Sequence, residues 1–142
     1  VLDPAVGTFA RVATGMRIPA RGSVYSVNEA NLETFPDGFK RYIAKCHAEG
    51  ASARYAGAMV ADVHRVLLKG GVFLFPPTAK APNGKLRLMY ECNPMAKIVT
   101  EAGGRAETGT GEILDVIPAE LHQRVPVIIG SQENVDALLA EL

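Results

Sequence analysis

Residues 71–76 read Gly71-Val72-Phe73-Leu74-Phe75-Pro76, a short and almost wholly apolar run. A run of this length without polar alternation is typical of a strand that is covered on both faces of its sheet. The preceding residues, 58–69, repeat apolar side chains at helical spacing and end at a pair of glycines, as helices often do. The sequence therefore predicts a helix followed by one of the most buried strands of the fold.

Related patterns continue on both sides of this unit. Alternating apolar and polar residues predict strands over residues 7–14 and 23–28, and helical spacing predicts a helix over residues 36–49. A further helix is predicted over residues 86–102. Because Pro94 cannot donate a backbone hydrogen bond, we expect a kink there, or a new start with Asn93 as the cap.

The last third of the chain carries shorter patterns. They predict strands over residues 105–108, 113–116 and 125–129, one helical turn over residues 118–123, and a final helix capped by Ser131. Strands that alternate with helices favour a layered α/β arrangement. We expect a single domain over residues 1–142, with an α/β fold whose mixed, roughly five-stranded sheet is flanked by helices.

The composition excludes several classes of protein. Hydrophobic residues make up 48% of the chain and charged residues 21%, which fits a globular domain and not a disordered or fibrous one. Fifteen basic residues balance fifteen acidic ones, so no net charge favours nucleic acid or an acidic membrane surface as a partner. Every apolar run is shorter than the ~20 residues that a membrane helix needs. These features predict a soluble protein.

The cysteines, histidines and termini give weaker signals. Cys46 and Cys92 are isolated and lack metal-ligand spacing, which favours a reduced, cytoplasmic compartment. The histidines share no short spacing, and the glycine pairs match no nucleotide-binding loop, so we interpret both as ordinary surface and turn residues. The chain starts at Val1 without a targeting pattern, which indicates a start inside a longer protein.

Two short stretches carry residues suited to binding phosphate. Lys85 and Arg87 place two cations beside a glycine-containing loop, where they can contact phosphate or sugar hydroxyls. Glu91 follows Arg87 by four residues, so it can form an ion pair with Arg87 or offer a hard oxygen ligand to Mg²⁺. Arg54 and Tyr55 precede a predicted helix and can bind phosphate at its N-terminus, or simply face solvent. Spacing leaves these alternatives open.

Longer motifs narrow the choice. Four runs resemble class I fructose-1,6-bisphosphatases and occur in the order found in that family: residues 25–29 (Tyr-Ser-Val-Asn-Glu), residues 54–65 with their Arg-Tyr and Met-Val-Ala-Asp-Val-His-Arg, residues 84–94 (Gly-Lys-Leu-Arg-Leu-Met-Tyr-Glu-Cys-Asn-Pro), and residues 121–126 (Leu-His-Gln-Arg-Val-Pro). The resemblance covers essentially the whole chain. It identifies the chain as the C-terminal, substrate-binding half of such an enzyme.

The resemblance implies a homotetrameric, Mg²⁺-dependent enzyme. Its reaction is hydrolysis of the 1-phosphate of fructose 1,6-bisphosphate, in gluconeogenesis or carbon fixation. Residues that match Asn28, Tyr55 and Lys85 contact the substrate in that family. Arg54 matches an arginine that reaches the 6-phosphate in a neighbouring subunit, and Glu91 matches a carboxylate ligand of the metal.

Two departures from the family pattern concern the 6-phosphate. Asn31 and Phe75 stand where tyrosines often occur, and each change removes a hydroxyl donor. A bisphosphatase that also accepts sedoheptulose 1,7-bisphosphate therefore remains open.

The resemblance also places most metal-binding carboxylates in a preceding half, which this chain lacks. Since one carboxylate cannot assemble a multi-carboxylate site, we expect the isolated chain to be inactive. A non-catalytic module for binding sugar phosphate or for assembly is the alternative.

Overall fold

The computed structural model describes residues 1–11 and 13–142, and its centre is a mixed five-stranded sheet in the order β4-β3-β5-β9-β7. Strand β3 runs parallel to both β4 and β5, whereas β9 runs antiparallel to both β5 and β7. The strands are β3 (Val24–Ser26), β4 (Ser52–Ala53), β5 (Val72–Phe75), β7 (Arg105–Glu107) and β9 (Val127–Gly130). This confirms the α/β prediction.

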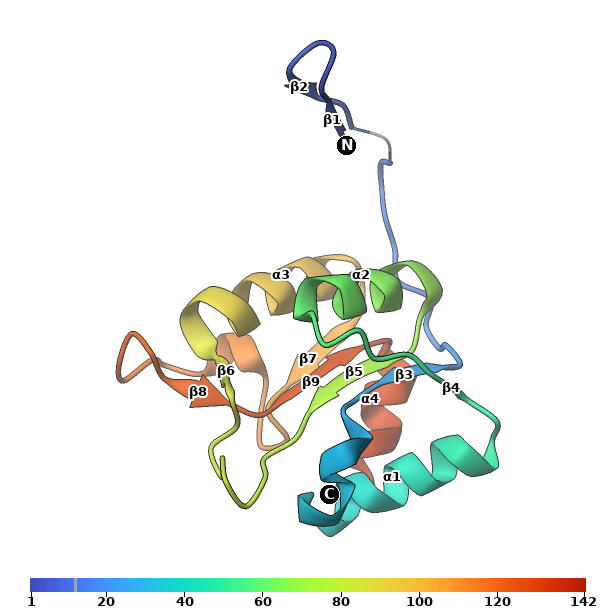
Figure 1. Ribbon diagram of the computed structural model, residues 1–142, viewed down its shortest axis with the longest axis vertical. Coiled ribbons are helices and arrows are strands. Elements are labelled where there is room, and N and C mark those ends of the chain that lie inside the picture. The colour runs from blue at the N-terminus through green and yellow to red at the C-terminus, as the bar shows by residue number, and fades with distance from the viewer. Residues whose placement is uncertain (12) are drawn as a thin grey trace.

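Helices cover both faces of the sheet (Figure 1). Helices α2 (Met59–Lys69) and α3 (Asn93–Glu101) lie on one face, and α1 (Asp37–Ala48) and α4 (Gln132–Leu139) lie on the other. Each pair of helices packs on its own apolar cluster, so the core has two layers with the sheet between them. None of the described residues belongs to a helix long and apolar enough to cross a bilayer.

Strand β5 belongs to both layers of the core. Phe73 points into the cluster beneath α2 and α3, while Val72 and Leu74 point into the cluster beneath α1 and α4. All three side chains are buried, and burial of each contributes about 1.5–3 kcal/mol. The period-2 alternation of a strand thus explains why the run is apolar at every position. The prediction of a buried strand over residues 71–76 is confirmed.

The N-terminal residues form a small hairpin, β1 (Leu2–Asp3) and β2 (Thr8–Phe9), which stands away from the sheet in Figure 1. Its residues are exposed. The strand predicted over residues 7–14 is therefore much shorter than expected, and its residue 12 lies outside the described residues.

The predicted helix over residues 86–102 begins differently from the prediction. Its first residues form a short strand, β6 (Leu86–Arg87), and a π-helix (Leu88–Cys92) leads from there into α3. Pro94 lies in the first turn of α3, where its missing N–H costs nothing, so the predicted interruption is confirmed. The cap position, however, is Cys92 and not Asn93.

Three predictions near the C-terminus need correction. Ile113–Asp115 is a 3₁₀-helix and not a strand, because the N–H groups of Asp115 and Val116 donate within the turn, 3.2 Å each to Glu112 O and Ile113 O. Residues 118–123 form turns without a helix. The strand predicted over residues 125–129 is divided by Pro126 into β8 (Arg124–Val125), which pairs with β6, and β9.

Ser131 occupies the predicted cap position of α4 but does not cap the helix with its side chain. Its Oγ instead donates to Pro19 O at 2.6 Å and accepts from Gly71 N at 3.0 Å. This hydroxyl therefore ties the start of β5 to the segment that leads into β3.

A close backbone approach generates a prediction for Gly71. Its φ is +108°, and an added Cβ would lie 2.0 Å from Val24 O. Replacement of Gly71 by alanine should lower the free energy of unfolding by at least ~2 kcal/mol, since both conformational strain and a clash result. Urea denaturation measures this.

Gly111 provides the matched control, because nothing lies within 4 Å of its added Cβ. Gly111→Ala should change stability by less than ~1 kcal/mol. Equal stability of the two variants would contradict the packing described for Gly71.

Candidate functional site

A cavity of about 600 Å³ opens at the carboxyl ends of three neighbouring parallel strands. Asn28 follows β3, Tyr55 follows β4, and Phe75 ends β5, and all three residues line the cavity. Ligands of α/β proteins commonly bind at this edge of a sheet, because the loops that follow the strands converge there. The fold therefore brings together residues that are far apart in the sequence.

The cavity is lined by cations without compensating carboxylates. Lys80, Lys85 and Arg124 contribute the charges, and none of the described residues that line it is an aspartate or glutamate. Neither lysine forms an ion pair within the described part of the chain. Charge-assisted hydrogen bonds from such groups bind phosphate strongly. The cavity is thus suited to an anion.

Lys80 lies at the tip of a pinned loop. The N–H groups of Thr78 and Ala81 donate to each other's carbonyl oxygen, at 3.1 and 3.0 Å, and Gly84 N donates to Ala81 O at 3.0 Å. Gly84 has a φ of +83°, and an added Cβ would lie 2.2 Å from Val125 O, so the loop presses against β8. These contacts hold the cationic side of the cavity in place.

The structure brings together three of the six residues singled out from the sequence. Asn28, Tyr55 and Lys85 line one cavity, and so do Asn31 and Phe75, at which the chain departs from the family pattern. Arg54, Arg87 and Glu91 do not line it.

Lys80 and Arg124 were missed as candidate residues by the sequence analysis. Arg124 lies within one of the four quoted motifs, but Lys80 carries no pattern of its own. The guanidinium of Arg124 also donates to Lys85 O, so it supports the backbone that carries Lys85.

Glu91 is engaged with Arg87, as the ion-pair interpretation expects. Its Oε2 accepts from Arg87 N at 2.7 Å, and its Oε1 lies 3.3 Å from Arg87 Nη1. The guanidinium also lies 5.9 Å from the centroid of the Tyr90 ring. The pair is only partly exposed, with 41% of the Arg87 side chain and 28% of the Glu91 side chain accessible.

These contacts leave Glu91 able to serve as one metal ligand. A carboxylate has about four lone-pair sites, and the two hydrogen bonds from Arg87 occupy two of them. No group of three or more metal-ligating side chains occurs among the described residues, however. Glu91 therefore fits a metal site only if other residues complete it.

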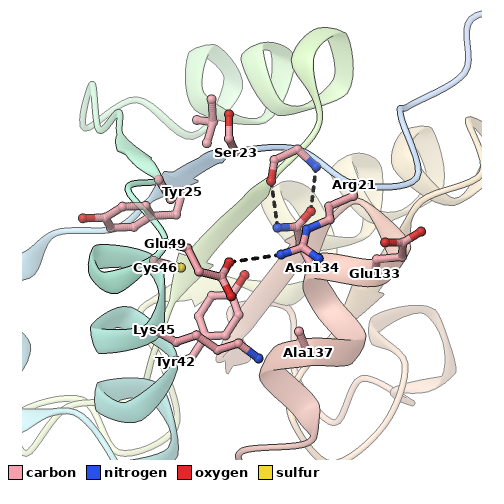
Figure 2. A pocket seen from close by; sticks show the side chains of 13 residues that line it. Arg21, Ser23, Tyr25, Tyr42, Lys45, Cys46, Glu49, Glu133, Asn134 and Ala137 are labelled. Atoms are coloured by element: carbon pink, nitrogen blue, oxygen red, sulfur yellow. Dashed lines mark hydrogen bonds and ion pairs between the residues drawn. The ribbon is translucent and has the colours of Figure 1, made fainter.

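A second cavity, of about 470 Å³, lies between α1, α4 and the segment leading into β3 (Figure 2). Three of its polar side chains already have partners. The side chain of Asn134 accepts from Gly22 N at 2.9 Å and donates to Gly22 O at 3.0 Å, and Arg21 lies 3.0 Å from Glu49. Charges of both signs line it, so it is not favoured as an anion site. We interpret it as a structural contact between α4 and the segment before β3.

Neither cysteine is suited to nucleophilic catalysis. Burial raises the pKa of the Cys46 thiol above its usual value and raises the pKa of the Cys92 thiol to about 12. Both thiols therefore remain protonated at neutral pH, and the thiolate is the reactive form.

Comparisons with known proteins agree with this arrangement. A family model described as "Fructose-1-6-bisphosphatase, C-terminal domain" matches residues 18–142. A protein described as "Fructose-1,6-bisphosphatase class 1" from a Synechococcus strain is 54% identical over 139 residues, which are 97% of this chain and 42% of that protein. One of the same description from Nostoc punctiforme is 55% identical over 136 residues, 95% of this chain and 39% of that protein.

A solved structure supports the same grouping. Fructose-1,6-bisphosphatase of Leishmania major in holo form superimposes with a TM-score of 0.96 and 45% identity, over 99% of this chain and 44% of that chain. The chain thus spans about two fifths of the length of the curated relatives that it matches.

The contacts of Asn134 generate a prediction for the second cavity. Asn134→Ala should lower the free energy of unfolding by about 1–3 kcal/mol, because the N–H and C=O of Gly22 lose their partner. Phosphate binding, measured by calorimetry on the same variant, should not change. Weaker phosphate binding with unaltered stability would show that the second cavity is the anion site.

Proposed function

This chain belongs to the fructose-1,6-bisphosphatase family, and we propose that it supplies the sugar-phosphate-binding half of an enzyme that hydrolyses the 1-phosphate of fructose 1,6-bisphosphate. The products are fructose 6-phosphate and inorganic phosphate, a step of gluconeogenesis or carbon fixation. One observation carries the proposal: Asn28, Tyr55 and Lys85 converge on a cationic cavity with no carboxylate among its described residues.

In this proposal, the cavity binds and orients the substrate. Lys85 and Lys80 neutralise phosphate charge, and the hydroxyl of Tyr55 and the amide of Asn28 donate hydrogen bonds to phosphate or sugar oxygens. A substrate fixed at its 6-phosphate end presents its 1-phosphate at a defined place, which reduces the entropy lost in the reaction. Arg87 does not line the cavity, but it lies two residues beyond Lys85, in β6, and we propose it as a further substrate contact.

The metal is proposed to be Mg²⁺, with Glu91 as one of its ligands. When bound, Mg²⁺ supplies charge neutralisation and an activated water. Because no group of three metal-ligating side chains occurs among the described residues, the remaining carboxylates are proposed to come from the other half of the enzyme. Glu91 would hold the ion with the lone-pair sites that its two contacts with Arg87 leave free.

The assembly is proposed to be a homotetramer. Arg54 does not line the cavity of its own chain, and its Nη1 donates to Ala53 O at 2.9 Å at the surface. Both observations support a role for Arg54 in a neighbouring subunit's site. Cys46 and Cys92 are both free thiols, which fits a reduced compartment, and we propose the cytoplasm.

Two alternatives rest on specific observations. Asn31 and Phe75 line the cavity without offering a hydroxyl, which favours a site that also accepts sedoheptulose 1,7-bisphosphate. The incomplete metal site of the described residues favours a non-catalytic sugar-phosphate-binding module. Turnover of both bisphosphates by the full-length enzyme, compared at equal concentration, separates these candidates from the first.

The isolated chain should show negligible phosphate release from fructose 1,6-bisphosphate with Mg²⁺, since a single carboxylate does not assemble the metal site. A malachite-green assay measures the released phosphate. Release near the ~10 s⁻¹ that is the median for enzymes generally would overturn this proposal, once a mock purification has excluded host phosphatase.

In the full-length enzyme, Lys85→Ala and Glu91→Gln should change different kinetic parameters. Lys85→Ala removes a charge-assisted donor and should chiefly raise KM, by the equivalent of ~1.5–3 kcal/mol. Glu91→Gln should lower kcat and demand more Mg²⁺, because an amide is a poorer ligand than a carboxylate for a hard cation. Steady-state kinetics across a Mg²⁺ titration distinguish the two effects.

Lys45→Ala is the matched control for the loss of a lysine charge. Lys45 lines the second cavity, so its removal should leave both KM and kcat unchanged. If Glu91→Gln kept the parent kcat and Mg²⁺ response, Glu91 would be only the ion-pair partner of Arg87.

A further inference from the structure

Asp62 is a fully buried carboxylate in the first turn of α2. Its Oδ1 and Oδ2 both accept from the backbone N–H of Ala56, at 3.0 and 3.1 Å. A buried charge is tolerated when it is paired and hydrogen-bonded, so these contacts account for its burial. They also attach the loop that follows β4 to the start of α2.

Arg65 attaches the same loop from its other end. Its Nη1 lies 2.8 Å from Asp62 Oδ1 and donates to Arg54 O at 3.1 Å. The pair thus contacts the carbonyl of the residue before Tyr55 and the N–H of the residue after it. We call Asp62 and Arg65 the α2 clamp.

Tyr55 depends on its backbone for its orientation. Its side chain lines the cavity but is 39% exposed, and it belongs to neither apolar cluster of the core. Two residues on, Gly57 has a φ of +76°, and an added Cβ there would lie 3.8 Å from Tyr55 Cε1. Because glycine has great conformational freedom, the loop needs contacts from elsewhere to hold one conformation.

We propose that Asp62 and Arg65 are positioning residues for the sugar-phosphate site: by holding the peptide groups on both sides of Tyr55, they aim its hydroxyl into the cavity. This inference rests on the proposed function of the cavity. The clamp touches no substrate and acts through the backbone of residues 54–56. A buried ion pair is weak as a source of stability, so a positioning role accounts for the pair better than stability alone.

The test compares Arg65→Met and Tyr55→Phe in the full-length enzyme with fructose 1,6-bisphosphate as substrate. Methionine keeps much of the apolar stem of arginine but donates no hydrogen bond. Arg65→Met should raise KM by about tenfold and change kcat by less than about twofold, since it disturbs placement and not chemistry. The double variant is the decisive measurement.

If the clamp acts through the hydroxyl of Tyr55, removal of Arg65 from the Tyr55→Phe enzyme should raise KM by less than about twofold. Independent, multiplicative effects of the two changes would overturn the inference. Asp62→Asn gives a second route, because it keeps the volume and one acceptor oxygen while removing the charge. In the Tyr55→Phe enzyme, Asp62→Asn should likewise raise KM by less than about twofold.

Arg105→Met is the matched control for loss of stability. Arg105 on strand β7 likewise pairs with a buried carboxylate, Glu107 at 2.8 Å, and with Asp136 at 2.5 Å, but it does not line the cavity. It should lower the melting temperature without raising KM. If it raised KM as much as Arg65→Met does, the effect of Arg65 would be structural and the inference wrong.

The single variants separate this inference from the proposed function. An unchanged KM for Tyr55→Phe would reject Tyr55 as a substrate contact, and the proposed site with it. A raised KM for Tyr55→Phe together with an unchanged KM for Arg65→Met would reject the clamp alone.

Discussion

Close approach of the backbone between β5 and its two neighbours determines the remainder of the fold. Gly130 pairs with Val72 across the antiparallel ladder, and a Cβ on Gly130 would lie 2.1 Å from Gly71 O. On the other side, a Cβ on Gly71 would collide with Val24 O. Only glycine leaves room for these approaches. Three segments from distant parts of the sequence therefore meet at one end of the sheet.

The pairing register of β5 and β9, which is fixed at that end, also determines the position of the cavity at the other end of the sheet. From Gly130 the ladder of β5 and β9 runs to the pair Phe75 and Val127, where β5 ends and β9 begins. Pro126 separates β9 from the preceding strand β8, which pairs with β6. This pairing brings Arg124 beside Lys85. A shift of register in β5 by one residue would move these cations and exchange the two buried faces of the strand, so that Phe73 would enter the cluster beneath α1 and α4.

Sequence patterns predicted the elements whose burial is periodic. Strand β5 and helix α2 were predicted because buried apolar residues recur in them at the spacing of the element, as Val63 and Leu67 do in α2. Residues 113–116 were misjudged because only Ile113 is buried, while Leu114 is 41% exposed. Strand β4 has two residues and no period, so it was missed.

Among the candidate residues, Asn28, Tyr55 and Lys85 were identified by resemblance to a family. Lys80 lines the cavity because its loop folds against β8, and no local sequence pattern predicts that contact.

The cavity is built mainly from loops and the ends of short elements, whereas the two core clusters are built from strands and helices. Changes at exposed positions such as Asn31 and Lys80 therefore remove little apolar packing, and surface substitutions of this kind usually alter stability by only ~0.5 kcal/mol. Selection can exchange hydroxyl, amide and ammonium groups around the proposed sugar-phosphate site while the sheet remains intact. On such a scaffold, substrate preference evolves almost independently of folding, and new specificities arise without compensating mutations in the core.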